Sequence, residues 1–98
     1  MDEKSKKEIQ AFKALKKGSH LEAENLLRQI VSSGTNNYLV YGNLAVLSEK
    51  KGHINEMLEY LTHSTKLNPK YAEGHFNLGI IYLKKGNFDN AVHSFLNT

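Results

Sequence analysis

Residues 75–95 read HFNLGIIYLKKGNFDNAVHSF, and this stretch decides the fold. Leu78 and Tyr82 stand before the turn Lys84-Lys85-Gly86, and Ala91 and Phe95 stand after it, each pair at helical spacing. The glycine can take the left-handed conformation that ends a helix, and lysines suit the negative end of a helix dipole. The stretch therefore predicts two antiparallel helices joined by a short turn.

The same turn occurs three times in the chain. Lys-Lys-Gly stands at 16–18, 50–52 and 84–86, so its glycines are 34 residues apart. Neighbouring positions keep this period, which aligns Ala23 with Met57 and Ala91, and Leu27 with Leu61 and Phe95. Such a period predicts a stack of helical pairs, in which each pair buries its apolar face only against the next.

The pattern around the third turn resembles the tetratricopeptide repeat signature, an aromatic-x2-Leu-Gly-x2-Tyr segment followed by Ala-x3-Phe. The matching residues are His75, Leu78, Gly79, Tyr82, Ala91 and Phe95, with a histidine where the family prefers an aromatic residue. The resemblance covers nearly the whole chain as repeats 4–37, 38–71 and 72–98 of one domain, 1–98. It implies an all-α, right-handed solenoid of antiparallel helix hairpins with about three repeats and six helices, the last one truncated.

Local signals predict where these helices begin and end. Ser19 is expected to open the second helix through a capping box with Glu22. Asn68 and Pro69 are expected to begin the fifth helix, as its cap and first residue. The other expected helices lie near residues 9–15, 38–50, 54–61 and 88–98, and the second helix should end at 32–34.

Composition narrows the class of protein. At 98 residues with 40% hydrophobic and 23% charged residues, the chain has room for one globular domain. It has no cysteine and no long apolar run, so we expect a cytoplasmic protein with no disulfide framework and no membrane span. The formal net charge of +3 includes a lysine-rich segment before residue 18, which reads as a solvated helix face rather than a nucleic-acid site.

Residues that could perform chemistry are scattered. The five histidines are His20, His53, His63, His75 and His93, and no two of them have the i, i+4 spacing of a helical metal site. Glu59 and His63 are four residues apart but lack a nucleophile or a third group. We therefore expect a non-catalytic chain without cofactor or metal.

The family resemblance implies that function lies on the concave face, which the first helix of each repeat lines. The residues that it places there are Phe12, Leu15, Leu39, Asn43, Val46, Phe76, Asn77, Ile80 and Leu83, beside a basic row of Lys16, Lys50 and Lys84. In a peptide groove, the amides of Asn43 and Asn77 can both donate to and accept from a ligand backbone. The alternative is that these residues only pack between helices and that the lysines only serve helix C-termini.

One subclass of the family is disfavoured. Chaperone-binding members hold an acidic C-terminal peptide with a carboxylate clamp of lysine, asparagine and arginine. The corresponding positions here are Glu8, Phe12, Asn43, Glu73 and Asn77, of which only Asn43 matches. Two of the expected cations are carboxylates, which would repel such a ligand.

These observations favour a protein–protein interaction module that binds a peptide or partner segment. One alternative is the N-terminal repeat region of a larger enzyme of the glycosyltransferase or sulfotransferase type. Another is a self-assembly element, because the last hairpin has no capping helix after it. We expect a homodimer through an exposed face that includes part of Tyr82, Ala91, Val92 and Phe95.

Overall fold

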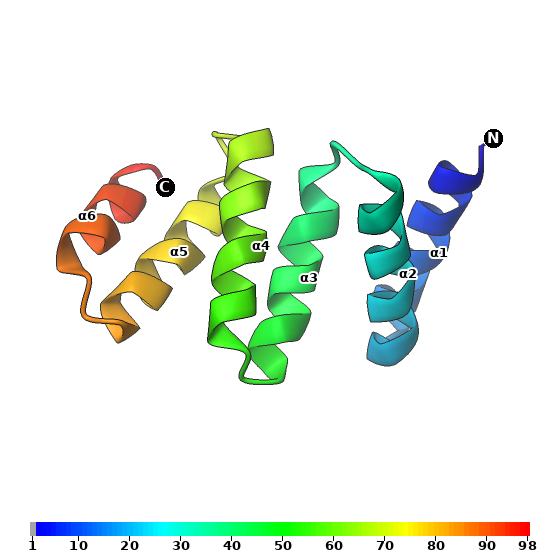
Figure 1. Cartoon of the computed structure of the whole chain (residues 1–98), viewed down its shortest axis with the longest axis horizontal. Helices are drawn as coiled ribbons and strands as arrows, with labels where there is room; N and C mark the ends of the chain where they lie inside the picture. The colour runs from blue at the N-terminus through cyan, green and yellow to red at the C-terminus, as the bar shows by residue number, and fades with distance from the viewer. Residues whose placement is uncertain (1) are drawn as a thin grey trace.

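The computed structural model describes residues 2–98, and this part of the chain forms six α-helices and no strand. The helices are α1 (Glu3–Lys17), α2 (His20–Ser33), α3 (Tyr38–Lys50), α4 (Ile54–Leu67), α5 (Ala72–Lys84) and α6 (Phe88–Leu96). They follow one another from α1 at one end of the molecule to α6 at the other (Figure 1). The fold is the all-α helical repeat array that the 34-residue period predicts.

Each helix packs on its neighbours in the chain. The closest pairs are α1 with α2, α3 with α4, and α5 with α6, and the joints between them are made by α2 with α3 and α4 with α5. The molecule is therefore elongated, with extents of 43 × 25 × 21 Å and its two termini at opposite ends (Figure 1). We call α1, α3 and α5 the first helices and α2, α4 and α6 the second helices of the three pairs.

Glycine makes the turn inside each pair. Gly18, Gly52 and Gly86 have φ values of 82°, 77° and 76°, which L-residues with a side chain rarely adopt. Each stands directly after a first helix or one residue beyond it, and its N–H bonds to a carbonyl of the last turn. The predicted turns are confirmed, and the period with them.

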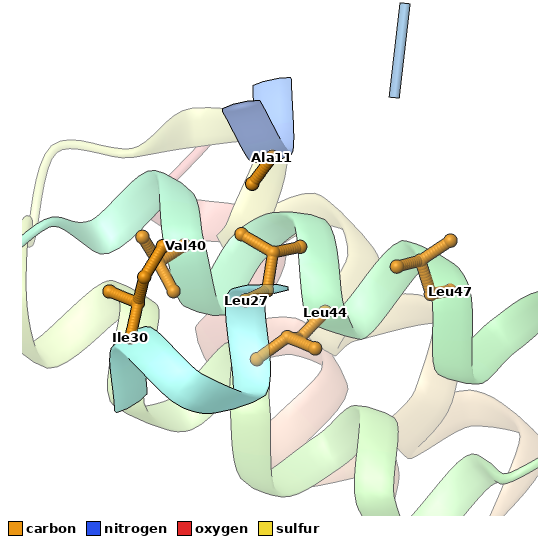
Figure 2. Close-up of a cluster of buried hydrophobic side chains, with 6 residues drawn as sticks. All are labelled: Ala11, Leu27, Ile30, Val40, Leu44 and Leu47. Atoms are coloured by element: carbon orange, nitrogen blue, oxygen red, sulfur yellow. The ribbon is translucent and has the colours of Figure 1, made fainter. Parts of the chain in front are cut away.

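The core is a chain of two clusters rather than one centre. Ala11, Leu27, Ile30, Val40, Leu44 and Leu47 form the first cluster, which joins α1, α2 and α3 (Figure 2). Ala45, Met57, Leu61, Leu78 and Ile81 form the second, which joins α3, α4 and α5. Each pair thus depends on the next for the burial of its apolar residues, as a repeat array requires.

The predicted start of the fifth helix was wrong. Asn68 ends α4, its side-chain oxygen accepts the N–H of Lys70, and its carbonyl accepts the N–H of Tyr71, so 68–71 is a turn. The helix begins at Ala72 because the ring of Tyr71 fills the space over Gly42 and Gly74, where a Cβ would meet it at 3.0 Å and 2.7 Å. Packing of this side chain overrides the local asparagine–proline signal.

Two other local predictions have different outcomes. Ser19 precedes α2, but its side chain makes no capping hydrogen bond, so the predicted capping box does not form. The first helix is longer than expected, because Asp2 caps it by accepting the N–H of Ser5 at 2.8 Å. Residues 35–37 lead into α3, which Asn37 caps: its side chain accepts the N–H of Leu39 at 3.0 Å.

Candidate functional site

The residues expected in the groove lie on the first helices, and all twelve remain at least partly accessible. Leu39 on α3, and Phe76 and Leu83 on α5, are large apolar side chains with 40–51% of their surface exposed. Phe12 and Leu15 on α1 are half-buried and pack against the first core cluster. The first helices therefore carry apolar side chains that the fold itself leaves uncovered, including Ile9 on α1, which is 42% exposed.

The apolar surface of α5 is supported from below by α6. The ring of Phe76 lies 5.7 Å from the ring of Phe95, and Phe95 also covers Gly79, where a Cβ would clash with it. Phe95 is therefore a packing residue inside the last pair, only part of which reaches the surface. It holds Phe76 in place on the exposed side of α5.

The two groove asparagines occupy equivalent half-buried positions, 34 residues apart, on α3 and α5. Asn43 donates its amide N–H to the backbone carbonyl of Leu39 at 2.8 Å. This bond fixes the orientation of the amide and leaves its oxygen and one N–H for another partner.

A basic edge runs along the C-terminal ends of the first helices. Lys16, Lys50 and Lys84 are exposed in the last turns of α1, α3 and α5. Lys51 and Lys85, which follow Lys50 and Lys84, reach back to the preceding pair of helices. Lys51 forms an ion pair with Glu24, and Lys85 donates a hydrogen bond to the side-chain oxygen of Asn55 at 2.6 Å. Of the second and third Lys-Lys dipeptides, one residue thus joins two repeats and the other is left at the surface.

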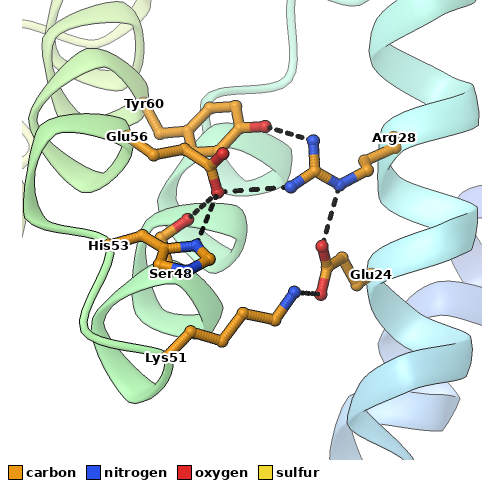
Figure 3. A network of polar contacts seen from close by, with 7 residues as sticks. All are labelled: Glu24, Arg28, Ser48, Lys51, His53, Glu56 and Tyr60. Carbon is orange, nitrogen blue, oxygen red and sulfur yellow. Dashed lines mark hydrogen bonds and ion pairs between the residues drawn. The ribbon is translucent and has the colours of Figure 1, made fainter.

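A polar network at the joint between the first two pairs was not foreseen from the sequence (Figure 3). Arg28 donates to Glu24 at 2.8 Å, to Glu56 at 3.2 Å and to the hydroxyl of Tyr60 at 3.1 Å. Glu24 is buried and also pairs with Lys51 at 2.5 Å. The i, i+4 spacing of Glu24 and Arg28 was the only available signal, and it does not indicate the partners on the next repeat.

The carboxylates of this network are held in their charged form. Hydrogen bonding from Lys51 lowers the pKa of Glu24, and burial opposes this only in part. Hydrogen bonding from Ser48 at 2.7 Å, together with the charge of Arg28, lowers the pKa of Glu56. The cluster therefore acts as an ionic connection between repeats, and its groups already satisfy one another.

The outward face of α6 is the other large apolar surface. Phe88, Val92 and Leu96 lie one turn apart and are 66%, 57% and 80% exposed. The inclusion of Ala91 in this face was wrong: it is 1% exposed, because the small residue faces the inside of the α5–α6 pair. Tyr82 is half-buried against the second core cluster, which leaves Phe88, Val92 and Leu96 as the residues of the face.

Two of the histidines contact neighbouring groups of the fold. His63 stacks on Tyr41 with 5.0 Å between ring centres, and His75 contacts the carbonyl of Pro69 at 2.8 Å. Across residues 2–98, no three His, Asp or Glu side chains are grouped so that they could hold a metal ion. None of the six helices has both the length and the hydropathy needed to span a bilayer.

Comparisons with solved structures reproduce the fold. The second TPR domain of Spaghetti (RPAP3), bound to the HSP90 peptide SRMEEVD, matches with a TM-score of 0.80 at 17% identity, over 98% of this chain and 89% of that one. The Sgt2 TPR domain from Aspergillus fumigatus matches with a TM-score of 0.75 at 20% identity, over 99% of this chain and 64% of that one. MamA from Desulfovibrio magneticus RS-1 matches with a TM-score of 0.78 at 17% identity, over 97% of this chain and 54% of that one.

The chain spans about half the length of the MamA structures that it matches. No curated protein sequence matches it. Two family models described as tetratricopeptide repeat match residues 38–71 and 60–93, so together they cover more than half of the chain. The first of these ranges coincides with the second repeat defined by the glycine turns. The chain belongs to the tetratricopeptide repeat family.

Proposed function

We propose that this chain is a non-catalytic interaction module that binds an extended or helical peptide segment along its first helices. The observation that supports this is the exposure of Leu39, Phe76 and Leu83 on two adjacent first helices. A fold that needed these side chains only for its own core would bury them, as it buries Leu44 and Leu78 on the same helices. The cytoplasmic location expected from the sequence stays a prediction.

The surface also suggests how a peptide would be held. Apolar side chains of the ligand would be covered by Leu39, Phe76 and Leu83, and its backbone would meet the amides of Asn43 and Asn77. Asn43 is already oriented by its bond to Leu39. The exposed lysine of each repeat places positive charge along one edge, so an acidic residue at that edge of the ligand would be favoured.

An acidic C-terminal peptide of the chaperone type is not the ligand that we propose. The Spaghetti domain in the comparison was solved with the HSP90 peptide SRMEEVD, but its likeness to this chain is one of fold. Two positions that the carboxylate clamp needs as cations are Glu8, which is half-buried, and Glu73, which is exposed. Both would repel a terminal carboxylate.

The test uses a peptide selected from a random display library on the immobilised wild-type chain, labelled for fluorescence anisotropy. Asn43→Ala combined with Asn77→Ala should weaken its binding about tenfold or more, since each amide hydrogen bond contributes about 0.5–1.5 kcal/mol. The helical signal and melting temperature should stay nearly unchanged. Asn25→Ala combined with Asn90→Ala, on the second helices, is the matched control and should bind like wild type.

Two results would contradict the groove. If the Asn43/Asn77 variant unfolds, these asparagines are structural. If it folds and binds every selected peptide as tightly as wild type, the ligand site lies elsewhere on the molecule.

We also propose a second copy of the chain as a partner, held through α6. Phe88, Val92 and Leu96 form a continuous apolar stripe over the whole length of this helix. Sedimentation equilibrium at rising protein concentration tests this directly. A chain that stays monomeric at about 1 mM would contradict it, since the dissociation constant of any dimer would then lie well above about 1 mM.

A further inference from the structure

We propose that two copies join through α6 in an antiparallel, two-fold contact centred on Val92, which closes the assembly at a dimer. The inference rests on the proposed self-association and adds its geometry. It follows from the repeat register, from the residues at the opposite end of the molecule, and from the order of apolar residues along α6.

The register shows that the exposed face of α6 is half of a repeat joint. Residues 34 positions before Phe88 and Val92 are Ile54 and Leu58, which pack against the cluster that holds Leu78 and Ile81 of the following repeat. Another 34 residues earlier, the position equivalent to Val92 is occupied by Glu24, which is buried and paired with Lys51. At the internal joints Leu58 is partly buried and Glu24 is buried, whereas Val92 on α6 is 57% exposed.

A head-to-tail arrangement would cover α6 with α1 of another copy, and the residues of α1 oppose it. At the joints, the residues that enter the preceding repeat are Val40, Leu44 and Leu47 on α3, and Gly74, Leu78 and Ile81 on α5. The equivalent residues of α1 are Lys6, Gln10 and Lys13, all exposed. Docking α1 on α6 would bury two lysines against phenylalanine and valine without a partner carboxylate for each.

The face of α6 is complementary to itself. Phe88 and Leu96 lie four residues on either side of Val92, so an antiparallel pair of α6 helices places Phe88 of each copy on Leu96 of the other and Val92 on its own equivalent. The helix contains no lysine or arginine in a chain of net charge +3, so the contact brings no like cationic charges together. Its acidic residue, Asp89, is exposed at the flank.

The contact is small, which sets its strength. Phe88 and Leu96 are separated by about 12 Å along the helix. One helix of nine residues per copy covers less than the roughly 800 Å² per partner of a standard interface. We therefore expect a reversible dimer with Kd above about 10 µM, which forms or dissociates with local concentration.

The absence of cysteine from the sequence allows a clean geometric test by oxidative cross-linking. Val92→Cys should form a disulfide dimer rapidly, because the two residues would face each other at the axis within the roughly 7 Å that a disulfide spans. Phe88→Cys mixed with Leu96→Cys should yield the mixed dimer, while Phe88→Cys alone should not, since its two copies would be about 12 Å apart along the axis, beyond the reach of a disulfide. Asn90→Cys, exposed on another side of α6, is the matched control.

The outcomes separate the geometry from self-association itself. A wild-type chain that remains monomeric in sedimentation overturns both. A wild-type dimer in which Val92→Cys cross-links no faster than Asn90→Cys overturns the two-fold contact alone. Rapid cross-linking between Lys13→Cys and Val92→Cys would show the head-to-tail arrangement instead. All of these positions are exposed, so the variants should keep the helical signal of wild type.

Discussion

The two ends of the molecule are built from the same repeat but carry opposite surfaces. The helices α1 and α6 lie at opposite ends of the molecule (Figure 1). Lys6, Gln10 and Lys13 are exposed on α1, whereas Phe88, Val92 and Leu96 are exposed on α6. These polar residues of α1 are compatible with contact with water. The apolar residues of α6 form the surface that we propose as an interface. The difference shows that the repeat fold accommodates either a polar or an apolar outward face, and that the side chains at a few positions decide which face a helix has.

The largest expected effect on the unfolding free energy is the difference between equivalent repeat positions on α3, inside the array, and on α1, at its end. Leu44→Ala removes a side chain that is 1% exposed at the joint of the first two pairs, and it should cost about 2–5 kcal/mol of unfolding free energy. Gln10→Ala, 34 residues earlier on the solvated face of α1, should change it by less than about 0.5 kcal/mol. Urea denaturation measures both. Equal costs would show that the outward face of α1 is not a free end.

Substitution of the turn glycine should cost the same stability in all three repeats. The difference between the two ends of the molecule would then lie in the side chains of the helices and not in the turns. Gly18→Val, Gly52→Val and Gly86→Val each force a β-branched residue to positive φ, with no neighbouring atom within 4 Å of the new Cβ. Each should destabilise the chain by roughly 1–2 kcal/mol through backbone strain. Thermal unfolding of the three variants checks this. A much larger cost at one turn would mean that the repeats differ in their backbones as well.

The joint between the first two pairs should depend on acid. The folded-state pKa of Glu24 lies below its ordinary value of 4.5, so its contribution to stability is present above that pH and is lost as the pH falls through the folded-state pKa. Glu24→Gln should remove this part of the pH dependence and cost about 1 kcal/mol at neutral pH, because the partners are partly exposed. Glu59→Gln, exposed on α4, is the control. Denaturation curves of identical pH dependence would show that the network is not an ionic connection.

The smallest effect on the stability of the monomer is expected when exposed apolar residues of α6 are replaced by lysine, as on the outward face of α1. Phe88→Lys and Leu96→Lys should each change the unfolding free energy of the monomer by less than about 0.5 kcal/mol, because both side chains are exposed. Chemical denaturation in dilute solution, where dimers dissociate, measures this. A loss of several kcal/mol would reveal that α6 needs this face for its own packing.

Much of this organisation is readable from the sequence because it repeats. Three Lys-Lys-Gly turns give the period, and the period gives six helices and their order in the array. The start of α5 could not be predicted from the sequence, because it depends on how the ring of Tyr71 packs over Gly42 and Gly74. Gly42 is distant from Tyr71 in the sequence, and neither contact follows from the 34-residue period. Local capping rules cannot detect such contacts, which is why Asn68 was misjudged as the cap of α5.

The candidate surfaces were predictable to different degrees. The groove residues follow from their place in the repeat, and the structure leaves them accessible. The face of α6 was placed on the wrong side at Ala91, because helical periodicity shows an apolar residue without showing which neighbour covers it. Phe88 and Val92 stand out as residues of the proposed interface only when their equivalents on α4, Ile54 and Leu58, are seen packed against the second core cluster.

The contrast between the two ends is tested most directly by backbone amide NMR spectra of the wild-type chain over a dilution series from about 1 mM to about 10 µM, a range that brackets the expected dissociation constant. The amide signals of α6, residues 88–96, should shift progressively on dilution, while those of α1, residues 3–17, should stay constant. Shifts that appear in α1 together with α6 would show head-to-tail association. Signals that stay constant throughout the chain would contradict the assignment of α6 as an interface.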